Sequence, residues 1–277
     1  MHLNLDDAAT AAAERLGLES FDAREWGASL RFCVPEKMVE RFFDRVKPHL
    51  APCLLAGSGD FHHLTALWLR RIEGDFTLFS FDNHPDWDVR PPRWSCGGWI
   101  NRAMENGCLK KAVVWGCGNF ELAFPGRIWA SGEARAGGRL EIRPWNERLS
   151  ARDRVRYRGL DRSTWRGEFE REVEFLRCRR VYATVDLDCL AGEWAACNWE
   201  NGLFDPDDLV WALGLLRART EFAGGDVCGA FSPPRHARWG QRLAAAFDHP
   251  RLEPPTAAKL EQTSCVVEKI WQALIGG

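Results

Sequence analysis

Three short clusters of acidic and imidazole side chains each follow an apolar run that is typical of a buried strand. The clusters are SGDFHH at 58–63, DNHPD at 82–86 and VDLD at 185–188. If the runs are parallel strands of one sheet, their carboxyl ends lie along one edge, where open α/β sheets bind ligands. We therefore expect the three clusters to meet at one point, although each cluster alone is also typical of a polar turn or a helix cap.

The side chains in these clusters are those that bind divalent metals. Carboxylates and imidazoles without converging thiolates favour Mn²⁺, Fe²⁺ or Zn²⁺ over Ca²⁺ and over thiolate sites. Alternate residues of an extended segment point the same way, so Asp82 and His84 face one cavity. The same spacing places Asp186 and Asp188 together, and Asp86 joins after the proline turn. Four carboxylates with at least two imidazoles suit two ions about 3.5 Å apart better than one.

The elements that must position these clusters alternate between apolar runs and amphipathic stretches. Candidate strands are 29–34, 53–56, 76–81, 112–116, 140–143, 181–185 and 227–231. Candidate helices are 1–17, 35–48, 62–71, 99–106, 167–177, 206–217 and 256–274. This alternation predicts a three-layer α/β/α fold with a mostly parallel, doubly wound sheet, built as one domain over residues 1–277.

Composition excludes several classes of function. The chain has 277 residues, a formal net charge of −2 and no uninterrupted basic block, which argues against nucleic acid as a partner. No apolar run reaches the roughly 18 residues of a membrane span. The ten cysteines are scattered without a C-x-x-C pair, so we predict neither a disulfide framework nor a zinc–thiolate site. We expect a cytoplasmic protein that acts on a small molecule, and a homo-oligomer is compatible with the sequence.

The three clusters resemble the motifs of the arginase/agmatinase ureohydrolases, within the larger arginase–deacetylase fold. That family has a G-G-D-H-[ST] turn, then D-A-H-x-D, then S-x-D-x-D. The counterparts here are SGDFHHLT, FDNHPD and ATVDLD, in the same order and at similar intervals, over about residues 50–235. The middle motif matches closely, the third partly, and the first carries one extra residue.

The resemblance implies a metal centre with a hydrolytic role. It implies two divalent ions, most often Mn²⁺, with six ligands: Asp82 and Asp186 bridging, His62 and Asp86 on one ion, and His84 and Asp188 on the other. A hydroxide held between the ions would be the nucleophile, and Asp86 would pass its proton to the leaving nitrogen. His63, which takes the place of the motif's Ser, is the second candidate catalytic residue.

The sequence departs from the family where arginine is recognised. The late-strand Glu that binds a guanidinium aligns with Gly229, and the His that shuttles protons in arginases aligns near residues 96–97, which are Cys and Gly. The resemblance thus implies hydrolysis of a C–N bond in a guanidino, amidino or amide compound other than arginine.

Several residues that follow the clusters are candidates for substrate binding. Trp87, Trp199 and Glu200 are the predicted contacts, because a Trp face binds a cationic or flat substrate and a carboxylate pairs with a cation. Glu121 is a second carboxylate that could replace the missing one. Packing of loops over the sheet is the alternative role of the Trp residues.

Two alternatives remain open at this point. A deacetylase of the same fold holds a single zinc and needs a Tyr that polarises the carbonyl, and this chain has only Tyr157 and Tyr182. A non-catalytic protein could also keep the fold and the metal ligands for stability or partner binding. A metallophosphoesterase is excluded, because its later G-D-x-x-D and G-N-H-[ED] motifs are missing.

Overall fold

The computed structural model describes residues 1–132 and 138–277 of the chain. At its centre is an eight-stranded sheet in the order β2-β1-β4-β10-β9-β5-β7-β8, in which all the described neighbours are parallel. The strands are β1 His2–Asn4, β2 Ser20–Asp22, β4 Cys53–Leu55, β5 Phe76–Phe81, β7 Leu109–Trp115, β8 Leu140–Arg143, β9 Arg180–Asp186 and β10 Glu221–Cys228. The predicted mostly parallel sheet is confirmed.

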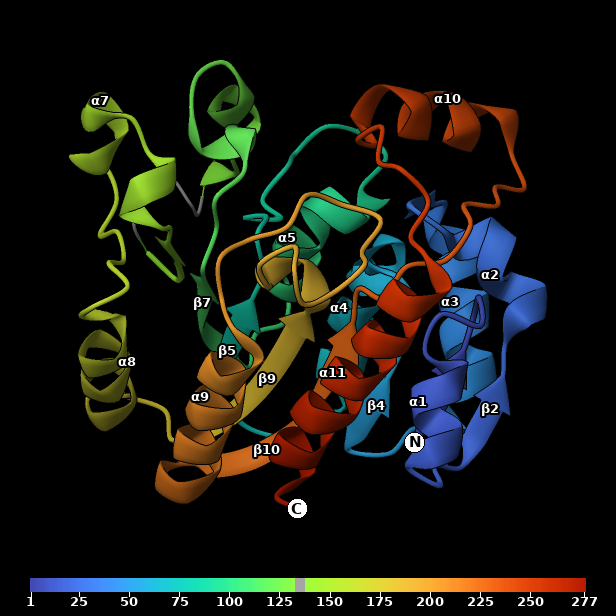
Figure 1. Ribbon diagram of the computed structural model, residues 1–277, viewed down its shortest axis with the longest axis horizontal. Coiled ribbons are helices and arrows are strands. Elements are labelled where there is room, and N and C mark those ends of the chain that lie inside the picture. The colour runs from blue at the N-terminus through green and yellow to red at the C-terminus, as the bar shows by residue number, and fades with distance from the viewer. Residues whose placement is uncertain (133–137) are drawn as a thin grey trace.

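Helices cover both faces of this sheet (Figure 1). One face carries α1 Thr10–Arg15, α8 Trp165–Glu174, α9 Pro206–Arg219 and α11 Ala257–Ile275. The other face carries α2 Arg24–Leu30, α3 Glu36–Val46, α4 Thr65–Trp68 and α5 Trp99–Ala103. The remaining described helices are α7 Ala151–Arg154 and α10 Trp239–Asp248. Across the described ranges, none of the helices combines the length and apolar character that a membrane crossing requires.

Strand β5 shows how the sequence produces the three layers. All six of its residues are buried. Leu78 packs in the core under α3–α5, whereas Phe79 and Phe81 pack in the core under α8 and α9. Because side chains of a strand alternate between faces, a strand buried on both faces must be apolar at every position or nearly so. The strand therefore delivers Asp82, the next residue, to the edge of the sheet.

The carboxyl ends of four adjacent strands form the edge that matters for function. The clusters at 58–63, 82–86 and 185–188 follow β4, β5 and β9. Strand β10 lies between β4 and β9, and its last residue, Cys228, pairs in register with Asp186. The three predicted clusters are thus brought to one place, as expected for a parallel sheet.

Two predictions for the amino-terminal part of the chain are wrong. Residues 29–34 do not form a strand of the main sheet: Ser29 lies in α2, and only β3 Cys33–Val34 pairs, antiparallel, with β6 Trp94–Ser95. Residues 1–17 are not one helix, because His2–Asn4 form β1 before α1 begins. These strands have only two or three residues, too few to produce a period in the sequence.

Candidate metal centre

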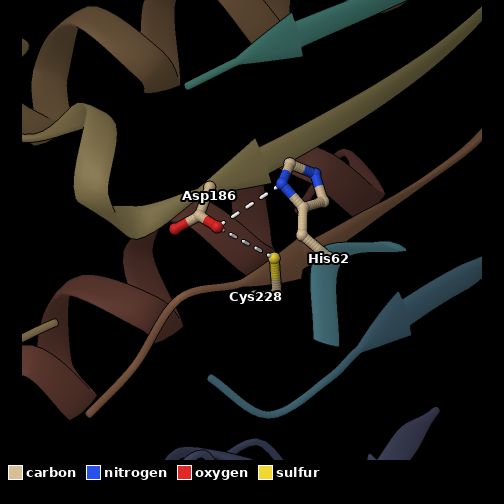
Figure 2. Close-up of side chains that lie close together, drawn as sticks. All are labelled: His62, Asp186 and Cys228. Atoms are coloured by element: carbon tan, nitrogen blue, oxygen red, sulfur yellow. Dashed lines mark hydrogen bonds and ion pairs between the residues drawn. The ribbon is translucent and has the colours of Figure 1, made fainter. Parts of the chain in front are cut away.

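His62 points its Nδ1 atom at the centre of the polar cluster. It lies on the short 3-10 helix Gly59–Leu64 that follows β4, and its ring is buried. Nδ1 is 3.4 Å from Asp186 Oδ2, a contact drawn as a dashed line in Figure 2, yet it has no partner in hydrogen-bonding geometry among the described residues. A buried polar atom without such a partner needs an explanation, and a metal ion supplies one.

The other nitrogen of His62 fixes which tautomer the ring adopts. Nε2 lies 2.9 Å from the Thr184 hydroxyl, and that hydroxyl donates its single hydrogen to Asp226 Oδ1 at 2.7 Å. Thr184 therefore accepts a hydrogen bond from Nε2–H, which leaves Nδ1 as the nitrogen that can bind an ion once its own proton is displaced. This chain of hydrogen bonds is the arrangement that orients a metal-binding His.

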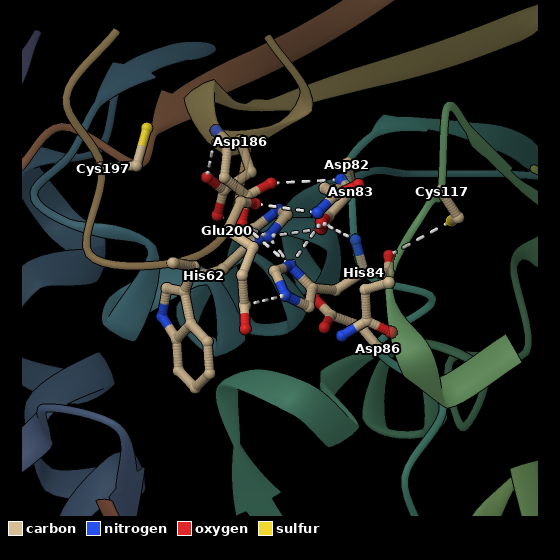
Figure 3. A network of polar contacts seen from close by, with 12 residues as sticks. His62, Asp82, Asn83, His84, Asp86, Cys117, Asp186, Cys197 and Glu200 are labelled. Atoms are coloured by element: carbon tan, nitrogen blue, oxygen red, sulfur yellow. Dashed lines mark hydrogen bonds and ion pairs between the residues drawn. The ribbon is translucent and has the colours of Figure 1, made fainter. Parts of the chain in front are cut away.

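Asp82 lies between the two histidines of the cluster (Figure 3). Its Oδ2 is 3.1 Å from His62 Nδ1, and its Oδ1 is 3.6 Å from His84 Nδ1. Each oxygen of the carboxylate thus faces a different imidazole. A carboxylate in this position can bind two cations at once.

His84 also turns Nδ1 toward the cluster. That atom is 2.9 Å from Asp188 Oδ2, while Nε2 lies 3.5 Å from Glu200 Oε2 on the outer side. Asp188 is held by the backbone N–H of Asn83, which donates to its Oδ1 at 3.1 Å. The predicted set of Asp82, His84 and Asp188 is therefore assembled, with its ligand atoms within 4.8 Å of one another.

Asp86 reaches the cluster through an unusual backbone conformation. Its φ is +48°, in the left-handed region that non-glycine residues rarely adopt. Its Oδ2 accepts a hydrogen bond from the indole N–H of Trp99 and lies 3.5 Å from His62 Nδ1. Such strain, of order 1 kcal/mol, is typical of residues held in place for function.

Asp186 occupies a more crowded position than the other carboxylates. Its Oδ1 accepts the backbone N–H of Asp188 at 3.1 Å, and its Oδ2 faces both His62 and the Cys228 thiol. Two glycines make room for it: a Cβ on Gly59 would lie 2.7 Å from Asp186 Oδ2, and one on Gly229 would lie 2.2 Å from Oδ1. A side chain at Gly229, where the resemblance places the guanidinium-binding Glu, would collide with the Asp186 carboxylate.

Burial and mutual contact shift the protonation of the whole cluster. Burial, together with the charges of neighbouring carboxylates, raises the pKa of Asp86 and of Asp186 well above the usual range. Burial alone would lower the pKa of His62, but its contact with Asp82 and the surrounding negative charge raise that pKa to about 10. The cluster therefore holds protons at pH 7 that a divalent cation would displace.

A cavity opens above the cluster toward solvent. Its lining includes Asp82, His84, Asp86, Trp199 and Glu121. The Trp199 indole donates to Asp60 Oδ1 at 3.1 Å, and its ring meets the His84 ring edge-on at 5.4 Å. Glu121 is half-buried, its Oε2 has no hydrogen-bond partner among the described residues, and burial raises its pKa to about 7.

The other predicted site residues lie at different distances from this cavity. Trp87 is buried and lines an adjoining pocket that shares Glu121 with the first. Glu200 is half-exposed; its carboxylate lies 3.5 Å from His84 Nε2, and its backbone carbonyl accepts a hydrogen bond from the Asn83 side chain at 2.8 Å. His63 is fully buried, is not among the described residues that line the cavity, and burial lowers its pKa to about 3. The catalytic role of His63 stays a prediction.

Comparisons with known proteins place this geometry in a wider context. No family model matches the chain. Over 206 residues it is 27% identical to an uncharacterized protein of Thermotoga maritima, an alignment that covers 74% of this chain and 68% of that protein. The arginase of Bacillus subtilis superposes with a TM-score of 0.59 at 12% identity, over 100% of this chain and 98% of that one. The chain has the arginase fold.

Other structures with the arginase fold are similar to the chain over most of its length. Formimidoylglutamase of Bacillus subtilis has a TM-score of 0.57 at 14% identity, covering 99% of this chain and 86% of its own. Proclavaminate amidino hydrolase of Streptomyces clavuligerus has a TM-score of 0.53 at 13% identity, covering 86% of this chain and 68% of its own.

Three residues that hold or face the candidate metal ligands were not predicted from the sequence. Thr184 and Asp226 hold His62 in its tautomer, and Cys228 faces Asp186. The signal for Thr184 was its place two residues before Asp186, which puts it on the same side of β9. Cys228 gave no signal, because it contacts the cluster only through the pairing of β10 with β9.

Proposed function

We propose that this protein is a metal-dependent hydrolase that holds two divalent ions and cleaves a C–N bond in a small guanidino, amidino or amide compound. The observation that carries the proposal is Asp82, whose two oxygens face the Nδ1 atoms of His62 and His84. Both imidazoles present a nitrogen to the same carboxylate, so each half of the cluster can hold one cation.

The types of ligand fit the proposed ions. Carboxylates and imidazoles, buried and crowded with charge, suit Mn²⁺, Fe²⁺ or Zn²⁺. When bound, a pair of such ions lowers the pKa of water from ~15.7 toward neutrality and supplies a hydroxide nucleophile. Nδ1 of His62 is the atom that points most directly to an ion, since it is buried among three carboxylates without a partner in hydrogen-bonding geometry among the described residues.

The residues around the cluster suggest their own roles in the reaction. Asp86 lies at the floor of the cavity and is held by Trp99, so it can take a proton and return it to a leaving nitrogen. Glu121 lines the same cavity and offers a carboxylate oxygen with no hydrogen-bond partner among the described residues, with which a cationic amidine or guanidine would pair. Proclavaminate amidino hydrolase and formimidoylglutamase share the fold, which supports an amidino-type substrate.

The absence of room at Gly229 argues against arginine as the substrate. The resemblance places a guanidinium-binding Glu at this position, but the residue is Gly229. Any side chain here would have its Cβ 2.2 Å from Asp186 Oδ1, so the packing leaves no space for a Glu. A smaller or differently held substrate that uses Glu121 instead is consistent with the cavity.

The deacetylase alternative is less well supported. It needs a Tyr hydroxyl at the metal, but Tyr182 donates to Asp226 at 2.7 Å beneath the site, and Tyr157 donates to the Leu122 carbonyl at 2.9 Å. Neither Tyr is among the described residues that line the cavity.

A substrate screen with a matched set of variants tests the proposal. Protein loaded with Mn²⁺, Fe²⁺ or Zn²⁺ should release ammonia, formamide or urea from at least one guanidino, amidino or formamide compound. Asp82→Ala and Asp186→Ala should lose metal and activity while the circular dichroism spectrum is retained. Asp88→Asn is the control for metal content, because Asp88 lines the same cavity but belongs to none of the described ligand groups. Full metal content without turnover on any compound would favour the non-catalytic alternative.

A further inference from the structure

We propose that Cys228 is a sulfur ligand of the ion that His62 holds, so that the two metal positions of the site differ in kind. The inference rests on the proposed metal centre and adds to it a thiolate that the motifs do not contain. The His62 position would then prefer Zn²⁺ or Fe²⁺, while the His84 position, with only oxygen and nitrogen ligands, would also accept Mn²⁺.

The contacts of Cys228 place its sulfur among the ligand atoms. Cys228 ends β10 in register with Asp186 on β9, so the two side chains leave the sheet edge together. The Sγ atom is 3.6 Å from Asp186 Oδ2, which is itself 3.4 Å from His62 Nδ1 (Figure 2). All three ligand atoms lie within 4.8 Å of one another, and all three residues are buried.

These distances match the edges of a tetrahedral metal site. With Zn–N near 2.0–2.1 Å, Zn–S near 2.3 Å and Zn–O near 2.0 Å, tetrahedral angles separate N from O by about 3.3 Å and S from O by about 3.5 Å. The observed separations are 3.4 and 3.6 Å. Two of the three edges therefore fit one shared ion, and the third, between His62 Nδ1 and Cys228 Sγ, is within 4.8 Å.

His62 provides an independent indication that a cation belongs here. Its Nδ1 is buried among carboxylates without a partner in hydrogen-bonding geometry among the described residues, and it is the nitrogen left to bind an ion because Nε2 donates to the Thr184 hydroxyl. Nδ1 has a single lone pair, so it can serve one ion only. Cys228 would bind this same ion, together with the Oδ2 atom that both side chains already face.

The other buried cysteines near the site have different surroundings. Cys117 donates to the His84 carbonyl with Sγ 3.4 Å away, and Cys197 lies 3.8 Å from the amide nitrogen of Asn201. Within the described residues, Cys228 is the cysteine that shares a ligand group with a His and an Asp.

Binding through sulfur requires the loss of one proton. Without an ion, the Cys228 thiol donates to Asp186 Oδ2. On loading, the S–H bond breaks, the sulfur lone pair forms the bond to the cation, and the proton passes to solvent. No oxidant or reductant is involved. Thiolate is a softer donor than carboxylate, which is why it favours Zn²⁺ or Fe²⁺ over Mn²⁺.

Cobalt substitution tests the inference directly. The full chain is loaded with Co²⁺ alone, bound cobalt is counted, and the near-ultraviolet spectrum is recorded for wild type, Cys228→Ser and Cys228→Ala. Cys197→Ala is the matched control, because that cysteine is also buried but belongs to no described ligand group. We expect a sulfur-to-cobalt charge-transfer band in wild type and Cys197→Ala and its loss in both Cys228 variants.

The metal affinities give a second readout. Cys228→Ser should bind one of its two Zn²⁺ ions at least tenfold less tightly, with Mn²⁺ affinity changed less than twofold. Two bound cobalt ions without the band, or a band that survives in Cys228→Ala, would overturn the inference and leave the proposed function intact. A chain that binds no cobalt would overturn both.

Discussion

The hydroxyl of Thr184 is the part of the site whose removal gives the sharpest prediction. Thr184→Val keeps the shape of the side chain but removes the acceptor for His62 Nε2–H. Asp226 still receives hydrogen bonds from Thr65 at 3.0 Å and Tyr182 at 2.7 Å, so the surrounding network survives. The variant therefore changes one contact of His62 while the fold is retained.

The expected magnitude follows from the burial of that contact. His62 is 2% exposed, so the orphaned Nε2–H finds no water, and a buried unsatisfied donor costs about 1–3 kcal/mol. If the ring turns to relieve this cost, Nδ1 no longer faces Asp82, and if the ring changes tautomer, Nδ1 carries the hydrogen and cannot bind an ion. Loss of such an orienting partner typically costs ~10–100-fold in metal affinity. We expect Thr184→Val to lower the metal affinity of the position that His62 serves by that factor.

Competition with a chromophoric chelator measures the effect, with circular dichroism as the check of folding. Thr184→Ser is the matched control, because it keeps the hydroxyl and loses only the methyl group. Thr184→Ser should bind metal within about threefold of wild type, given that a surviving hydrogen bond retains most of its ~1 kcal/mol. If Thr184→Val binds as tightly as wild type, or if both variants lose affinity equally, the hydrogen bond does not position His62.

Three further predictions concern the rest of the site. Gly229→Ala should lower both metal content and the melting temperature, because the new Cβ would lie 2.2 Å from Asp186 Oδ1 at a residue with φ of +104°; an unchanged metal count would contradict the described packing. Glu121→Gln should lower kcat/KM for a cationic substrate at least tenfold and leave metal content intact, whereas equal losses with a neutral substrate would exclude charge pairing. Metal loading at pH 7 should release protons, measured by calorimetry in buffers of different ionisation enthalpy. The pKa of His62 is raised to about 10 from its ordinary value of 6.5, so the stability that its proton contributes is lost as pH rises through this window. The free energy of unfolding of the metal-free protein should fall by about 1.4 kcal/mol per proton and pH unit over this range, which lowers the melting temperature at pH 9 relative to pH 6. Metal should stabilise the protein more at pH 9.

The sequence contained enough to predict the fold and most of the cluster. Continuous apolar runs such as 76–81 could only be strands buried on both faces, and a parallel sheet collects their carboxyl ends. Asp82 and His84 lie together in the structure, as the two-residue period of DNHPD predicts, and Asp186 and Asp188 line the same cavity.

The choice between His62 and His63 could not be made from the sequence. Both lie on a 3-10 helix, where successive side chains point about 120° apart and three residues complete a turn. Only the approach of β5 and β9 decides which ring meets carboxylates, and it selects His62. His63 turns instead into a site without hydrogen-bond partners among the described residues.

Long-range pairing determined the remaining features. Cys228 faces Asp186 because β10 inserts between β4 and β9, an order that no local pattern specifies. The Arg31 guanidinium, buried near the site, contacts Asp60 Oδ2 at 2.6 Å and Ser232 Oγ at 2.8 Å, so it joins segments about 200 residues apart. Such contacts arise from the assembled fold rather than from its individual elements.

The number of metal ions per chain tests the central claim most directly. Protein purified without chelator is measured by inductively coupled plasma mass spectrometry, beside Asp82→Ala as the variant that removes the shared ligand. We predict close to two ions of manganese, iron or zinc per wild-type chain and the loss of most of this metal from the Asp82→Ala chain, because that variant removes the carboxylate that faces both imidazoles. A single zinc per chain, or an unchanged metal count in Asp82→Ala, would contradict a binuclear centre built around Asp82.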